Sequence, residues 1–320
     1  MATLSLYLFV AGAIMLGLGF VFHVAYASVL AASGHALPAF GRSTRLVGAG
    51  AGAGAGHGAG AGHGAGAGAG AGFAAGGGPD LSATPAALAI GAAWTAWLLI
   101  GLSMVLRALI VSRGPWGNMY EFSIAFAFGI VSGYLFLQRR YPIRSLGFLP
   151  VGVALFLVGY AATLPATIEP LVPALENVPL LTIHVAMAMI SYGILATSFG
   201  AAVAYLIQGP GNRVRWLPPA KVLDEVAYRA VIIGFPIFAT MIILGSWWAS
   251  IAWGRYWGWD PKETSALVTW LIYAVYLHAR SQRGWAGRPS ALILVIGFGA
   301  VLFTYFGNLF FSGLHAYSGL

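Results

Sequence analysis

The sequence contains no cysteine and few charged residues. Without cysteine the chain cannot form a disulfide, a thiolate metal site or a CxxC redox pair, so it is not itself a thiol oxidant or reductant. Only 8% of its 320 residues are charged, whereas a soluble globular domain has roughly 25%. By contrast, 59% are hydrophobic, in runs that reach the ~20 residues a membrane-spanning helix needs. These features exclude a soluble enzyme, a nucleic-acid-binding protein and a disordered chain. They predict an all-α, polytopic integral membrane protein.

About eight apolar segments are predicted to span the membrane. Their approximate ranges are 4–31, 86–111, 119–138, 146–164, 180–207, 229–252, 263–281 and 290–312. The segments between them carry the glycine, proline and charged residues that are typical of loops. The sequence therefore predicts a helical bundle of about eight transmembrane helices.

The distribution of basic residues predicts the orientation of these helices. If the N-terminus lies outside, 12 of the 16 Lys and Arg residues fall in inner loops: Arg42, Arg45, Arg139, Arg140, Arg144, Arg213, Arg215, Lys221, Arg229, Arg280, Arg283 and Arg288. Arg107 lies near the outer end of the second span and can snorkel to the interface. The positive-inside rule then predicts that both termini lie outside, and it explains the net charge of +8 without a nucleic-acid partner.

A glycine- and alanine-rich repeat divides the chain. Residues 46–79 carry almost no large apolar side chain that could be buried, so they are predicted to form a flexible linker. Residues 1–45 then hold the first transmembrane helix and an inner loop, and residues 80–320 form a seven-helix body.

The most informative segment is the tryptophan-rich stretch 247–263, which the topology puts on the outer face. Glycines separate Trp253, Trp257 and Trp259, and such a pattern suggests a flat surface that a planar ligand can approach closely. The alternative is an interfacial aromatic belt, which the upstream Trp247 and Trp248 fit well.

The same loop carries charged residues whose spacing suggests two roles. Asp260, Pro261 and Glu263 have the spacing of a capping box with proline at the first helical position, so they are expected to begin the seventh span. Arg255 and Lys262 are either ordinary interfacial cations or partners for the carboxylates of a ligand.

The histidines form the second group of candidate site residues. His184 and His315 lie at the outer ends of their spans, at the level of the tryptophan loop, and two neutral imidazoles are natural axial ligands for haem iron. His278 lies near the inner end of the seventh span, where an ionisable side chain usually faces a cavity or a partner. His23 lies at a comparable depth and is either a mate for His278 or part of an interhelical hydrogen bond.

A further outer segment precedes the third span. Asn118 and Glu121 have the spacing of a helix N-cap and its third residue. With Tyr120, they form either a simple cap or a wall of the same outer pocket.

These motifs resemble the CcsA (ResC) family of the System II pathway for cytochrome c maturation. The run from Trp253 to Glu263 is similar to the tryptophan-rich WWD signature of haem-handling proteins. The resemblance covers roughly residues 80–320, and its further elements are Asn118-Met119-Tyr120-Glu121, Thr269-Trp270, Tyr276-Leu277-His278-Ala279-Arg280, Gly307-Asn308 and Ser312-Gly313-Leu314-His315. Ser265 departs from the pattern, because relatives commonly have tryptophan there.

The resemblance implies a function in haem transport and presentation. Family members carry haem b to the outer membrane face and present it to the CxxCH motif of apocytochrome c, as the haem-handling subunit of a holocytochrome c synthase of the haem lyase type. The resemblance assigns His184 and His315 as outer haem ligands and His278 as a membrane-embedded ligand. It also implies a membrane partner, CcsB (ResB or Ccs1), which supplies another transmembrane histidine. The expected location is a bacterial plasma membrane, or the thylakoid in plastid relatives.

Thioether formation joins an apocytochrome thiol to a haem vinyl group, so the protein has to hold and orient haem. Under this hypothesis the loop from Trp253 to Trp259 contacts the haem, Arg255 and Lys262 neutralise its propionates, and no residue has an assigned catalytic role. Two other classes stay open: a di-haem transmembrane electron-transfer protein, and a non-haem transporter with histidine proton relays.

Overall fold

The computed structural model describes residues 1–33, 83–168, 173–209, 211–282, 285–307 and 310–315, and in these ranges the regular secondary structure is entirely helical. The long helices are α1 (Ala2–Ser33), α2 (Ala83–Val111), α3 (Met119–Gln138), α4 (Phe148–Ala162), α5 (Val178–Gln208), α6 (Ala220–Trp253), α7 (Pro261–Ser281) and α8 (Arg288–Phe306). Two short 3₁₀ helices, η1 (Arg144–Leu146) and η2 (Pro173–Leu175), precede α4 and α5. The prediction of an all-α polytopic membrane protein is confirmed. The predicted linker 46–79 lies outside the described residues.

The long helices differ in how well they suit a lipid environment. Among the described residues, seven helices are long and apolar enough to cross a membrane. The helix α7 is not one of them, although it forms over 21 residues close to the predicted seventh span. Tyrosine, threonine and charged side chains lower its hydropathy, so its interior face carries polar groups.

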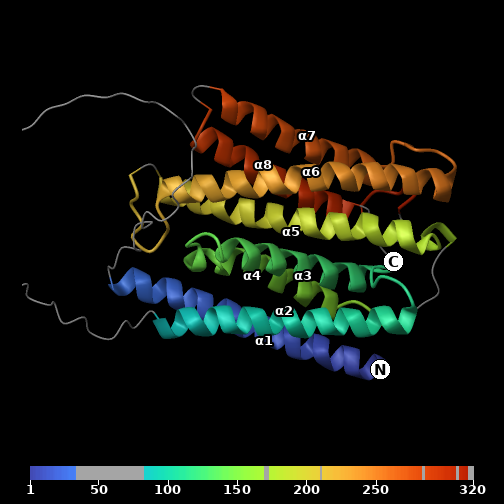
Figure 1. The fold of residues 1–320 in the computed structure, drawn as a ribbon, viewed down its shortest axis with the longest axis horizontal. Helices are drawn as coiled ribbons and strands as arrows, with labels where there is room; N and C mark the ends of the chain where they lie inside the picture. The colour runs from blue at the N-terminus through green and yellow to red at the C-terminus, as the bar shows by residue number, and fades with distance from the viewer. Residues whose placement is uncertain (34–82, 169–172, 210, 283–284, 308–309, 316–320) are drawn as a thin grey trace, which may run out of the picture.

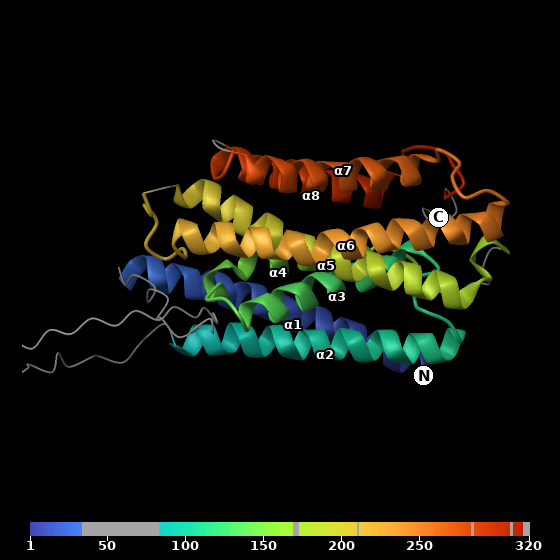
Figure 2. The ribbon, with the colours of Figure 1, turned by 45° about the horizontal axis from the view of Figure 1, so that its top comes forward.

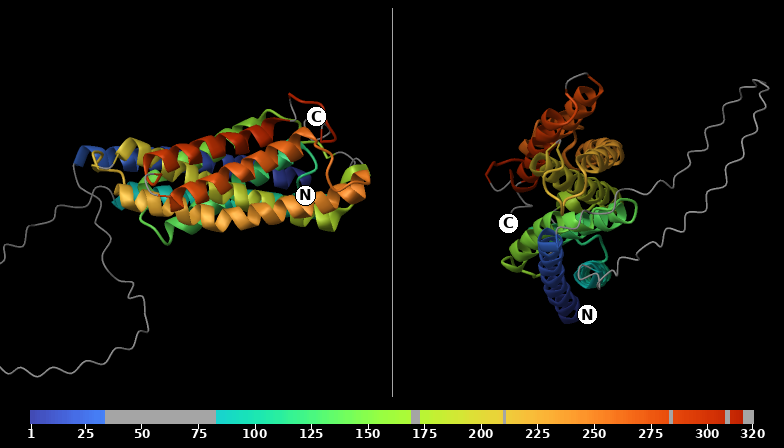
Figure 3. Two further views of the ribbon diagram at one scale, coloured as in Figure 1. Left: turned by 90° about the horizontal axis from the view of Figure 1, so that it is seen from above. Right: turned by 90° about the vertical axis from the view of Figure 1, so that its left-hand side faces the viewer.

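The helices are arranged with one pair at each edge of the bundle. Figures 1 and 2 show α1 beside α2 at one edge and α7 beside α8 at the other, with α3, α4, α5 and α6 between them. The end-on view in Figure 3 likewise separates α1 and α2 from α7. A Cβ atom at Gly12 in α1 would lie 2.7 Å from the Ile100 side chain of α2, so glycine permits the close approach of this pair.

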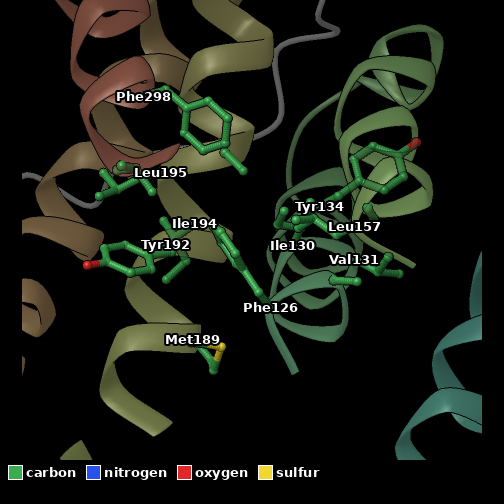
Figure 4. Close-up of a cluster of buried hydrophobic side chains, with 14 of the residues drawn as sticks. Phe126, Ile130, Val131, Tyr134, Leu157, Met189, Tyr192, Ile194, Leu195 and Phe298 are labelled. Carbon is green, nitrogen blue, oxygen red and sulfur yellow. The ribbon is translucent and has the colours of Figure 1, made fainter. Parts of the chain in front are cut away.

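The centre of the bundle is a close crossing of α3 and α5. A Cβ atom at Gly133 in α3 would lie 2.6 Å from the carbonyl oxygen of Gly193 in α5, and Gly129 approaches the same turn of α5. Small residues at such crossings let helix backbones pack closely in a membrane. Around this crossing the buried side chains of Phe126, Tyr192 and Phe298 join α3, α5 and α8 (Figure 4).

One end of the bundle gathers the segments that carry the candidate site. Figure 1 shows the loop between α6 and α7, the beginnings of α3 and α5, and the end of α8 at the same end. We call it the tryptophan end. Met1 and residues 310–315 also lie at this end. The two ends of a chain lie on the same side when the chain crosses a membrane an even number of times.

Candidate functional site

A large pocket opens at the tryptophan end. The space between its walls amounts to about 1060 Å³, which includes space open to the outside. The long helices α3, α5, α6, α7 and α8 and the loops before α3 and α7 contribute to its wall. Its lining includes Asn118, His184, Trp248, Trp257, Lys262, Tyr305 and His315. The pocket therefore joins segments that are separated by up to two hundred residues in sequence.

His184 lies near the start of α5 and is held against α6. Its Nδ1 atom donates a hydrogen bond to the carbonyl oxygen of Met241 over 2.9 Å, because a carbonyl can only accept. A Cβ atom at Gly245 would lie 2.6 Å from the imidazole, so only glycine leaves room for the ring in this position. Protonation at Nδ1 places the lone pair of the neutral ring on Nε2, the atom available to bind a metal ion.

His315 lies after the end of α8 and is oriented by Asp260. The Nδ1 atom donates to the Asp260 Oδ1 atom over 2.7 Å, and the other carboxylate oxygen accepts from the Leu314 amide over 2.6 Å. The lone pair of the neutral imidazole is again on Nε2. Both histidines thus have the tautomer that ligating histidines adopt when an acceptor holds the other nitrogen.

Asp260 has two structural roles at once. It accepts from the backbone amide of Lys262 over 2.9 Å and, with Glu263, forms the predicted capping box at the start of α7. Burial acts to raise the pKa of Asp260. The hydrogen bond and charge of His315 and the backbone amides of Lys262 and Leu314 outweigh this effect and lower the pKa to about 2. Burial also lowers the pKa of His315, against the opposing influence of Asp260. At neutral pH the pair is therefore a carboxylate and a neutral imidazole.

Trp248 contacts both histidines. Its indole is nearly parallel to the His184 ring, with centroids 6.4 Å apart and an interplanar angle of 9°, and its centroid is 5.8 Å from that of His315. The predicted aromatic belt fits Trp247, which is 55% exposed, but not Trp248, which is 2% exposed. The assignment of Trp248 to the belt was wrong, because α6 turns this side chain into the bundle.

The three tryptophans of the loop differ in how close they lie to the pocket. Trp257 lines it, and the Trp253 ring is 4.8 Å from the His315 ring in an edge-to-face contact. Trp259 lies 70% exposed, with a positive φ of 56°, and meets Trp257 edge to face. The loop is fixed by a hydrogen bond from the Gly258 amide to Glu263 over 2.8 Å. The structure thus brings two of the three predicted tryptophans to the histidines.

Known proteins that are similar to this chain belong to a single family. The sequence model of the family described as "Cytochrome C assembly protein" matches residues 116–315. Three similar proteins are each described as "Cytochrome c biogenesis protein CcsA". That of Synechococcus elongatus is 34% identical over 294 residues, covering 75% of this chain and 89% of the relative. That of Gloeothece citriformis is 33% identical, covering 73% and 89%, and that of Mesostigma viride is 35% identical, covering 68% and 82%.

The chain belongs to the CcsA family. This membership confirms the predicted resemblance and gives the protein a role in cytochrome c maturation, which implies the handling of haem. The matched range begins at Trp116 and ends at His315, so it contains every pocket residue named above. The helices α1 and α2 lie outside that range.

The two predicted cations lie differently in this CcsA protein. Lys262 lines the pocket, and its Nζ atom is 5.2 Å from the centre of the Phe122 ring. Arg255 is exposed and lies against Gly258, where a Cβ atom would come within 2.9 Å of its Nε atom. The geometry therefore makes Lys262 the nearer cation for an anionic group in the pocket.

The start of α3 is capped as predicted. Asn118 accepts from the Glu121 amide over 2.9 Å and also lines the pocket. Tyr120 instead packs edge to face on Phe9 of α1, with ring centroids 5.4 Å apart. Of this segment, the structure brings Asn118 to the pocket wall and turns Tyr120 toward α1.

Glu121 forms a buried ion-pair network that the sequence analysis missed. Its two carboxylate oxygens accept from Arg107 over 2.6 Å and from Arg113 over 2.8 Å. Arg107 also donates to the carbonyl oxygen of Thr167 over 3.1 Å. Arg107 is 8% exposed, because its guanidinium group lies inside the protein against Glu121. The three charges tie the ends of α2 and α3 together behind the pocket.

The two deeper histidines do not meet. His23 is fully buried, with Nδ1 2.7 Å from the Gly19 carbonyl oxygen and Nε2 2.9 Å from the Tyr134 hydroxyl oxygen. This is the interhelical hydrogen bond that the sequence analysis offered as its alternative. His278 lies exposed on α7 near the opposite end of the bundle, and α1 and α7 occupy opposite edges in Figure 2.

Proposed function

We propose that this CcsA-family protein binds haem b in the pocket at the tryptophan end and presents it for attachment to apocytochrome c. His184 and His315 are the proposed iron ligands. The observation that carries the proposal is their shared geometry: both imidazoles line one pocket, and each has Nδ1 committed to an acceptor. An acceptor at Nδ1 fixes the ring orientation and raises the basicity of Nε2 toward a metal ion.

The pocket suits a large, flat, mainly apolar ligand with acidic edges. Trp248 and Trp257 supply aromatic walls, and Tyr305 and Phe122 continue them. Lys262 supplies a cation for a propionate. The exposed tip of the loop, with Trp259 and Arg255, lies where an incoming protein can reach it. These residues match the needs of haem better than those of a compact polar solute.

In this proposal haem is the cargo, and it supplies the iron and the vinyl groups. The apocytochrome thiol adds across a vinyl double bond: a carbon–sulfur bond forms, the proton goes to the other vinyl carbon, and no group leaves. The protein therefore needs to orient the haem and exclude competing poses rather than supply a nucleophile. The chain has no cysteine that could compete for the vinyl group.

The proposal includes a second haem contact at His278, shared with a CcsB-type partner of System II. His278 is exposed on α7, on the same side as Leu271 and Val275, which are 47% and 57% exposed. A transmembrane helix of the partner can pack on this side and supply a second ligand. Haem would then reach the tryptophan end, which we propose to be the outer face of a bacterial plasma membrane.

The test is an absorption spectrum of the protein purified with its partner, oxidised and then reduced with dithionite. We expect the sharp reduced bands of a haem with two imidazole ligands. His184→Ala and His315→Ala should each lose or shift them, and added imidazole should restore them if the side chains act as ligands. Loss in His278→Ala alone would place the resting haem at the deeper site. A colourless protein would support the transporter, and bands unchanged in every histidine variant would overturn the ligand assignment.

A further inference from the structure

The helix α7 has an inverted distribution of polar residues. Its buried residues are Thr269, Tyr273, Tyr276 and Ala279, so three of the four carry a hydroxyl group. Its opposite side is apolar and exposed, with Val268 at 48%, Leu271 at 47% and Val275 at 57%. In a membrane protein, polar groups that face the bundle interior commonly mark a path for a solute, an ion or water.

The hydroxyl groups begin at the pocket. The Thr269 Oγ1 atom is 3.1 Å from the Oγ1 atom of Thr304, a residue that lines the pocket. Tyr273 follows one turn further along α7 and is buried. The buried face of α7 is therefore continuous with the polar groups at the pocket floor.

The same face ends at a partly buried ion pair. Arg280 of α7 and Asp224 of α6 form two parallel hydrogen bonds of 2.6 and 2.7 Å. The guanidinium group also lies 4.4 Å from the centre of the Tyr228 ring. Tyr276 lies one turn before Arg280 and is buried. Polar groups thus follow α7 from the pocket toward the opposite end of the bundle.

Three polar atoms on this path are buried and lack hydrogen-bond partners among the described residues: the hydroxyl oxygens of Tyr273 and Tyr276 and the Trp270 Nε1 atom. Tyr273 is only 1% exposed. The Trp270 ring stacks on Phe235 of α6, with centroids 4.8 Å apart, so its orientation is fixed. Leaving such groups unpaired in an apolar interior is unfavourable, and bound water is a common partner.

We infer that the buried face of α7 binds a file of water molecules, which runs from the pocket at the tryptophan end toward the Arg280–Asp224 pair. The spacing suits water: at about 1.5 Å of rise per residue, successive polar residues are separated by about 4.5 to 6 Å along the axis. One water molecule with two hydrogen bonds of about 2.8 Å spans that distance. The inference goes beyond haem presentation, and it holds or fails whether or not His184 and His315 bind haem.

The direct test is X-ray hydroxyl-radical footprinting of the intact protein in nanodiscs, because radicals form from the water molecules next to a side chain. Tyr134 is the matched control: it is fully buried, and its hydroxyl group has a protein partner in His23. We expect Tyr273 and Tyr276 to be labelled at least several times faster than Tyr134. Labelling of Tyr273 no faster than that of Tyr134 would overturn the inference.

A variant gives a second, independent readout. If water binds the Tyr273 hydroxyl, Tyr273→Phe removes a satisfied group, and the thermal midpoint should fall and Tyr276 labelling should decrease. If the site is dry, the same change removes an unpaired hydroxyl group, and the midpoint should rise, which would overturn the inference. Tyr305→Phe is the control, because its hydroxyl is bonded to Ser123 and its loss should lower the midpoint. If Tyr273→Phe does not fold, the footprinting of the wild-type protein decides alone.

Discussion

Asp260 orients His315 through the same carboxylate that begins α7. One oxygen accepts from the His315 imidazole over 2.7 Å, and the other accepts from the Leu314 amide over 2.6 Å. The residue also closes the capping box of α7. The start of one helix and the segment after another are therefore one unit, and the position of His315 depends on a residue 55 positions earlier in the chain.

Asp260→Asn separates the capping role from the positioning role. Asparagine is also a good N-cap, but its amide nitrogen cannot accept from Leu314. We expect α7 to remain helical while the haem affinity of the tryptophan end falls about 10–100-fold, as is typical when an outer-shell partner of a ligating histidine is mutated. Circular dichroism checks the helix and haem titration checks the affinity. An unchanged affinity would remove Asp260 from the haem site.

The pair also predicts how stability depends on pH. The folded pKa of Asp260, about 2, is lower than its ordinary value of 3.8. The folded state therefore binds fewer protons between these values, so its contribution to stability is complete above about pH 4 and is lost as the pH falls toward 2. The pKa of His315 is also lowered, by burial, so its protonation should begin to reduce stability below about pH 6.5.

This dependence is measured as the thermal midpoint of the haem-free protein between pH 2 and pH 8. His315→Gln should flatten the part of the profile below about pH 6.5, and Asp260→Asn should flatten the part below about pH 4. A wild-type midpoint that rises on acidification would contradict both signs.

The buried network at the start of α3 predicts a large loss of stability. Glu121→Gln leaves the guanidinium groups of Arg107 and Arg113 without their carboxylate partner inside the protein. Breaking a buried ion pair from one side costs about 3–5 kcal/mol. The matched control is Glu225→Gln, which removes an exposed pair with Arg229 and should change the stability far less, because solvent screens exposed pairs. Unfolding in denaturant compares the two, and equal effects would contradict the structural role of the network.

The sequence predicted the helix caps and the location of the two histidines better than it predicted which side chains are in contact. Helix caps at Asn118 and Asp260 depend on residues three positions apart, so local spacing was sufficient to find them. The shared location of His184 and His315 followed from counting membrane crossings. By contrast, which side of α6 faces inward depends on its packing against α5, so Trp248 was misassigned. The partner of Arg107 depends on how α2 and α3 meet, which no local pattern encodes.

Gly245→Ala tests the position of His184 without changing a ligand. The added Cβ atom would lie 2.6 Å from the imidazole, so the ring has to leave the Met241 carbonyl group. We expect haem binding to weaken by at least tenfold while the protein still folds. Gly159→Ala is the control, because the added atom meets nothing within 4 Å apart from its two chain neighbours and the nearby backbone of its own helix, and haem binding should not change. The haem titration described for Asp260→Asn also measures the haem affinity of these two variants. Equal affinities would show that the position of His184 does not matter for haem binding.

The proposed outer location of the pocket predicts an asymmetric labelling pattern. The chain has no cysteine, so single cysteines can be introduced without removing any native thiol. Ser312 is exposed in the segment 310–315 at the tryptophan end, and Ser281 is exposed as the last residue of α7, which ends at the opposite end of the bundle. In intact cells, a membrane-impermeant maleimide should label Ser312→Cys and not Ser281→Cys, and permeabilised cells should show labelling of both. The reverse pattern would put the pocket on the cytoplasmic face, where haem could still bind but could not be presented to an exported apocytochrome. This one matched pair therefore separates haem binding from haem presentation.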